Sequence, residues 1–118
     1  MLRSRHAFLS LLVLALVGVA ALAGCKAKVT PIKTLLDDPA RFDGQQVNVA
    51  GDVTAAVGVL GYGAYRINDG TGTILVVTKD SGAPREGARV GVSGTFRSAF
   101  TLGTETAAVI QETTRYTP

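Results

Sequence analysis

Two stretches of alternating sequence, residues 46–55 and 89–96, commit much of this chain to β-structure. Apolar side chains recur at every second position in each stretch, which gives an extended strand one apolar and one polar face. Both stretches follow the pattern Val-x-Val-x-Gly-x-apolar, with Gly51 and Gly94 at the glycine position. Glycine inside a strand is unfavourable unless the strand bends or bulges there. Because a small closed sheet needs sharply coiled strands, the two glycines predict the bends of a barrel.

Three further stretches are predicted to be strands, namely residues 65–68, 73–78 and a weaker one at 106–113. Between the first two lies Asp69-Gly70-Thr71-Gly72, in which the glycines allow turn conformations and Asp69 can accept bonds from the following backbone. One carboxylate is too few for calcium, and no lysine follows as in a phosphate loop. We therefore interpret this tetrapeptide as a hairpin turn.

One short helix is predicted before the strands. Thr30 suits the N-cap and Pro31 the first helical position, and Pro39 ends the helix. The spacing of Ile32, Leu35 and Leu36 places these side chains on one face. Residues 80–87 are rich in glycine, proline and charge, which predicts no second helix there.

The first 24 residues have the features of a secretory signal. Arg3 and Arg5 precede an uncharged apolar run over residues 7–24. The ending Leu22-Ala23-Gly24-Cys25 resembles the lipobox of bacterial lipoproteins. That resemblance implies cleavage before Cys25 and attachment of diacylglycerol and a fatty acid such as palmitate to this residue. The alternative is an uncleaved membrane anchor, for which 18 residues is near the short limit.

The lipoprotein interpretation divides the chain into a signal peptide (1–24), a lipidated tether (25–30) and one domain (31–118). It also implies a lipid-anchored protein of the bacterial cell envelope that faces the periplasm. Lys26 follows the cysteine, and by resemblance to the enterobacterial sorting rule this favours the outer membrane. Lys26 and Lys28 are interpreted as solvated tether residues that could also lie against anionic headgroups.

The residue types available after the signal leave little scope for catalysis. The sole histidine, His6, lies in the signal, and the sole cysteine is Cys25. A histidine-based triad, a Cys–His pair and ordinary zinc ligation are thereby excluded. Asp37 and Asp38 are adjacent and so do not face each other on a helix. We therefore expect no catalytic residues, no metal and no cofactor, and not an enzyme.

Three segments resemble the OB-fold family: residues 38–53 (DPARFDGQQVNVAGDV), 65–77 (YRINDGTGTILVV) and 84–96 (PREGARVGVSGTF). They most resemble anticodon-binding domains and small periplasmic OB proteins. The resemblance implies an all-β, five-stranded Greek-key barrel with one short N-terminal helix. The usual helix between the third and fourth strands is missing, so helix 32–36 is expected to plug the barrel. One periplasmic relative, a haem chaperone of cytochrome c maturation, holds haem on a histidine that this chain lacks after its signal.

Two loops used for binding in OB folds correspond to residues 56–63 and 98–104, and both are uncharged. Their larger apolar side chains are candidate contacts for a protein or envelope ligand, particularly Leu60, Tyr62, Phe100 and Leu102. The competing interpretation is that the strands extend through these segments and bury the same residues.

The candidate functions fall into three classes. The first is a non-catalytic, membrane-anchored module that binds a protein or envelope ligand. The second is binding of nucleic acid or another polyanion such as an oligosaccharide, through the outward-facing Arg66, Arg89 and Arg97. From Cys25 onward, however, ten basic residues face nine acidic ones, and nucleic-acid-binding domains usually show a strong basic excess. The third class, a carrier of a small ligand or metal, is disfavoured by the residues available.

Overall fold

A computed structural model describes residues 28–59, 62–79 and 82–118. The predicted signal, Cys25 and Leu60 lie outside these ranges. The described chain is mostly strand, as predicted, with two short helices. The elements are α2 (Ile32–Asp37), α3 (Pro39–Phe42), β1 (Gln46–Val59), β2 (Tyr62–Asn68), β3 (Thr73–Thr78), β4 (Arg89–Leu102) and β5 (Glu105–Tyr116).

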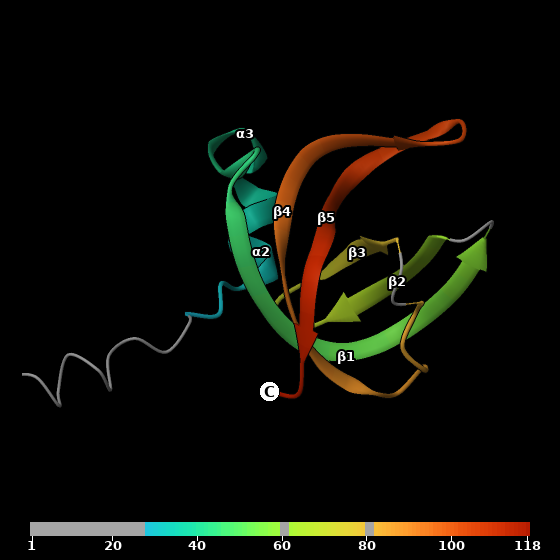
Figure 1. Ribbon diagram of the computed structural model, residues 1–118. Helices are drawn as coiled ribbons and strands as arrows, with labels where there is room; N and C mark the ends of the chain where they lie inside the picture. Colours follow the sequence, from blue (N-terminus) through green and yellow to red (C-terminus); the bar gives the residue numbers. More distant parts are fainter. Residues whose placement is uncertain (1–27, 60–61, 80–81) are drawn as a thin grey trace, which may run out of the picture.

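The five strands close into a barrel with the order β1-β2-β3-β5-β4 (Figure 1). Neighbouring strands are antiparallel except β3 and β5, which are parallel over Leu75–Val77 and Val109–Gln111. The β4–β5 hairpin returns β5 to the open edge of β3 and thereby closes the ring. This arrangement is the five-stranded Greek-key barrel expected from the sequence.

The core contains the side chains that the alternating pattern assigned to the inner face. Val49 and Val92 lie on neighbouring strands in register, and both are fully buried. Phe96 and Ile67 are also fully buried. The predicted inner faces of the strands are therefore confirmed. The buried apolar cluster consists of Ile32, Leu35, Val47, Val49, Val53, Tyr65, Ile67, Ile74, Val76, Val90, Val92, Phe96 and Ile110.

The two glycines of the shared pattern lie where strands approach closely. A Cβ atom on Gly94 would lie 2.2 Å from the backbone oxygen of Gln111, and one on Gly51 would lie 2.4 Å from that of Asn68. The β4–β5 register shifts between Ser93 and Gly94, which marks a bulge at the predicted position. In β1 the irregularity comes a little later, between Val53 and Ala55.

Helix α2 plugs the barrel, but its details differ from the prediction. Pro31, not Thr30, is the N-cap residue, and the Thr30 amide donates to the Asn48 carbonyl of β1. Ile32 and Leu35 are fully buried, whereas Leu36, at the margin of the apolar face, is 39% exposed.

The chain after α2 contains one helix that was not predicted. Asp38 interrupts the helix as expected before a proline, and Pro39 then begins the short α3, since proline is well suited to a first helical turn. No helix occurs over residues 82–88.

The predicted binding loops are instead the ends of two long hairpins. β1 and β2 pair out to Val59 and Tyr62, and β4 and β5 pair out to Leu102 and Glu105. The loop prediction was wrong because apolar and β-branched residues can continue an antiparallel ladder wherever a partner strand is available. In Figure 1 both hairpins project from the side of the barrel opposite the incoming N-terminal chain. No helix in the described part of the chain is long and apolar enough to cross a membrane.

Candidate functional site

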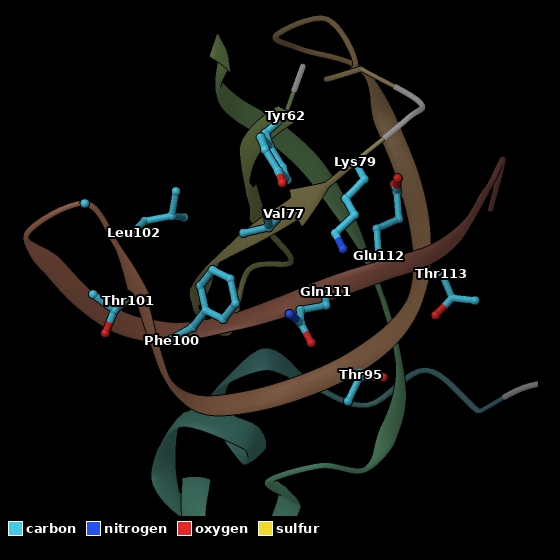
Figure 2. Close-up of a pocket in the computed structure, with 11 residues that line it drawn as sticks. Tyr62, Val77, Lys79, Thr95, Phe100, Thr101, Leu102, Gln111, Glu112 and Thr113 are labelled. Carbon is cyan, nitrogen blue, oxygen red and sulfur yellow. The ribbon is translucent and has the colours of Figure 1, made fainter. Parts of the chain in front are cut away.

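A pocket of about 620 Å³ lies between the two hairpins, over the seam of β3 and β5 (Figure 2). Tyr62 enters it from the β1–β2 hairpin, and Phe100 and Leu102 enter from the β4–β5 hairpin. Val77 of β3 lies between them. The remaining lining residues are Lys79, Thr95, Thr101, Gly103, Gln111, Glu112 and Thr113.

The structure thus brings together three of the four apolar residues singled out in the sequence, while Leu60 falls outside the described residues. Tyr62 is 53% exposed and Leu102 is 42% exposed. Phe100 is half-buried. The strands extend as the competing interpretation held, yet they do not bury Tyr62 and Leu102.

A second pocket, of about 240 Å³, adjoins the first and shares Phe100 and Leu102 with it. It continues along the outer face of β3 past Leu75 to Leu36 of α2. Arg66 also lines this smaller pocket. The two pockets together form a groove beneath the β4–β5 hairpin.

Glu112 lines the main pocket and was not predicted as a site residue. Tyr65 donates its hydroxyl hydrogen to Glu112 Oε1, and Arg115 Nε donates to the same oxygen at 2.8 Å. The Glu112 side chain is only 2% exposed. Burial alone raises the pKa of this carboxyl, but hydrogen bonds from Arg115, Tyr65 and Thr78 outweigh burial and leave the pKa below its ordinary value.

Tyr65 and Arg115 complete this polar cluster. Burial, and then the adjacent Glu112 carboxylate, raises the pKa of the Tyr65 hydroxyl far above its ordinary value. The Arg115 guanidinium lies 5.2 Å from the centre of the Tyr65 ring and also donates to the Gly82 carbonyl. Because each group bonds another, the cluster is suited to holding the barrel together. The inward alternation of β5 from Ile110 to Glu112 was the signal that could have found it.

The three arginines of the polyanion hypothesis are exposed but do not line the main pocket. Arg89 lies 3.5 Å from Asp52 in an exposed ion pair. Arg97 Nε donates to Gln111 Oε1 at 3.0 Å. Arg66 alone borders the groove, through the smaller pocket.

The tetrapeptide from Asp69 to Gly72 is a turn, as predicted, and it also caps helix α2. Asp69 Oδ1 accepts bonds from the Thr71 amide at 2.8 Å and the Gly72 amide at 3.1 Å. Asp69 Oδ2 accepts the Ile32 amide at 2.9 Å, and Thr71 Oγ1 accepts the Lys33 amide at 3.2 Å. Among the described residues, no group of three or more histidines, cysteines or carboxylates could hold a metal ion.

Comparison with known proteins finds similar folds among solved structures. No protein-family model matches the chain, and no curated protein matches it. An aspartyl-tRNA synthetase from Entamoeba histolytica is similar, with TM-score 0.62 and 16% identity over 77% of this chain and 21% of that one. An asparaginyl-tRNA synthetase from Pyrococcus horikoshii has TM-score 0.55 and 19% identity over 64% of this chain and 20% of that one.

A smaller protein is similar over nearly its whole length. OBody AM3L09, bound to hen egg-white lysozyme, has TM-score 0.59 and 16% identity over 77% of this chain and 95% of that one. The present chain, by contrast, spans only about a fifth of the two synthetases. At these identities the likeness concerns architecture alone. The barrel order, the short plugging helix and these neighbours together show that the domain has the OB fold.

Proposed function

We propose that this protein is a non-catalytic OB-fold binding module that is held at the bacterial cell envelope by lipid on Cys25. Its ligand is a protein or another envelope component, bound in the pocket between the two hairpins. The proposal favours the periplasmic face of the outer membrane. The observation that carries it is the convergence of Tyr62, Phe100 and Leu102 on one pocket.

The chemistry of the pocket suits an apolar or protein surface better than a chain of phosphates. Among the described residues that line it, Lys79 and Glu112 carry the charges, and Arg115 already neutralises Glu112. Binding through phosphates requires a track of several cations. Exposed tyrosine and large apolar side chains are instead typical of the centres of protein interfaces. The OBody bound to lysozyme is one case of a barrel of this shape bound to a folded protein.

The same residues support a non-catalytic role. The described chain contains no histidine. The most enclosed carboxylate, Glu112, is held by Tyr65 and Arg115, and its lowered pKa keeps it ionised at neutral pH. A general acid needs the opposite shift, towards neutral pH.

A photoreactive amino acid placed at Leu102, in the native full-length protein, tests the pocket directly. The matched control is the same amino acid at Glu86, an exposed position that lines neither pocket. Irradiation of intact cells is expected to give discrete adducts from position 102 and none from position 86. Equal adducts from both positions, or none from position 102, would contradict the proposal.

The alternative function is binding of nucleic acid or another polyanion such as an oligosaccharide, and the likeness to two tRNA synthetases favours it. Fluorescence anisotropy with a short single-stranded RNA, at low and at physiological salt, separates the two. Under our proposal the RNA binds weakly and Arg66→Glu has no effect. Tight binding that falls with salt and is lost in Arg66→Glu would instead establish the alternative.

A further inference from the structure

The segment that precedes and begins helix α2 is attached to the barrel by hydrogen bonds. The Thr30 amide donates to the Asn48 carbonyl of β1 at 2.8 Å. The amides of Ile32 and Lys33 are held by Asp69 and Thr71 of the β2–β3 turn. Because the Ile32 and Leu35 side chains are fully buried as well, residues 30–35 are fixed to the barrel.

The segment between this fixed point and the predicted lipid is short. Thr30 is five positions after Cys25, and an extended chain covers at most about 3.6 Å per position, or about 18 Å in all. A small domain is roughly 30 Å across. A lipid on Cys25 therefore cannot reach the bilayer unless the end of the barrel that carries Thr30 lies next to the membrane.

The pocket lies towards the other end of the domain. In Figure 1 the described chain begins next to α2 at one side of the barrel, whereas the tips of both hairpins point to the opposite side. The turn of the β4–β5 hairpin, at Gly103 and Thr104, is exposed, and Gly103 lines the pocket.

We propose that the bilayer lies against the end of the barrel formed by residues 28–33 and the β2–β3 turn, so that the pocket opens away from the membrane. This inference rests on lipidation of Cys25, which belongs to the proposed function. Of the two lysines at this end, Lys28 is exposed and can lie against anionic headgroups, whereas Lys33 is exposed but paired with Asp37. The ligand is then a molecule that approaches from the aqueous compartment, not a lipid of the anchoring bilayer.

Depth-dependent fluorescence quenching tests this orientation in the lipidated full-length protein. Once Cys25 is acylated, a cysteine introduced by Lys33→Cys or Thr104→Cys is the sole free thiol and takes one fluorophore. Each protein is placed in phosphatidylethanolamine–phosphatidylglycerol vesicles that contain lipids with nitroxide headgroups. Emission from position 33 is expected to fall several-fold more than emission from position 104.

Two controls make the outcomes separable. Mass spectrometry of the same samples reports the acyl groups on Cys25, and their absence would overturn both the lipid anchor and the orientation. Acylated protein with equal quenching at both positions would overturn the orientation alone.

A flexible linker of about 20 residues inserted after Lys28 adds a mean reach of roughly 25 Å and is expected to remove the difference in quenching between the two positions. A contrast that survives the insertion would show that the tether does not set the orientation.

Discussion

Asp69 accepts a hydrogen bond from a backbone amide at the start of helix α2 that has no partner within the helix. The first amides of any α-helix lack partners within the helix, and Pro31 at the N-cap has no side-chain acceptor. Asp69, 37 positions further along the chain, accepts the Ile32 amide in addition to amides of its own turn. One carboxylate therefore both shapes the β2–β3 turn and fixes the plugging helix to it.

The charge on Asp69 predicts a pH-dependent contribution to stability. Partial burial alone raises the pKa of this carboxyl, but hydrogen bonds from Thr71, Ile32 and Gly72 outweigh burial and bring the pKa below its ordinary value of 3.8. Because the folded pKa lies below the unfolded one, the stabilisation is present above about pH 4 and is lost as the pH falls through the folded pKa.

Replacement of Asp69 tests this contribution. At neutral pH Asp69→Ala is expected to lower the free energy of unfolding by about 1–2 kcal/mol, as for loss of a helix N-cap, and Asp69→Asn by less. The free energies of unfolding of the wild type and Asp69→Asn can be measured in urea at several pH values from about 7 down to about 2. The difference between them should shrink as the pH falls. A difference that stays constant over this range would show that the carboxylate charge does not stabilise the cap.

The ion pair between Glu112 and Arg115 leads to a second prediction about stability. Arg115→Met removes the cation beside a carboxylate that is 2% exposed, and this is expected to cost about 3 kcal/mol. Glu112→Gln combined with Arg115→Met removes both charges and keeps an acceptor for the Tyr65 hydroxyl, so the double variant should be more stable than Arg115→Met alone. Urea unfolding of the double-mutant cycle measures the coupling, and additive effects would contradict the assigned pairing.

The strands of the barrel depend on close approach at two glycines. Gly94→Ala and Gly51→Ala each place a Cβ against a backbone oxygen of the adjacent strand, which can move only if the sheet distorts. We expect each to lower the free energy of unfolding by about 1–3 kcal/mol. Gly58→Ala in the projecting part of β1 is the matched control, because its Cβ would meet no atom within 4 Å. Equal urea midpoints for all three variants would refute this account.

The centres of the strands were predictable from sequence, but their ends were not. Alternation identified the inner faces of β1 and β4 because one side of each strand must be buried. Beyond Ala55 and Phe96 the alternation fades, yet both strands continue because β2 and β5 supply antiparallel partners. Ladder formation between neighbouring strands thus overrode the local signals on which the loop prediction rested.

Across the whole molecule, the candidate site was predictable only in part. Three apolar residues in two segments could be proposed to meet because OB barrels bring those segments to one side. The links from Tyr65 to Glu112 and from Asp69 to Ile32 join residues 47 and 37 positions apart. Alternation along β5 could have placed Glu112 on the inner face, but the pairing of such distant residues follows only from barrel closure.

The anchoring of the complete protein is tested by Cys25→Ser. Without a thiol, no lipid can be attached, so metabolic labelling with a fatty acid is expected to fall to background. The variant should accumulate as unlipidated protein or as a full-length precursor. Undiminished label in Cys25→Ser would contradict the predicted lipidation site, and wild-type protein processed in parallel is the reference.

The long-range cap on α2 also constrains the order in which the chain acquires structure. A six-residue helix is too short to persist alone, so residues 32–37 stay unfolded until residues 69–72 are in place to cap them. The ring closes only when β5, the last of the five strands to be made, pairs with β3 and β4. A chain truncated before residue 105 therefore presents open edges on β3 and β4, and the closed barrel forms only once β5 is present.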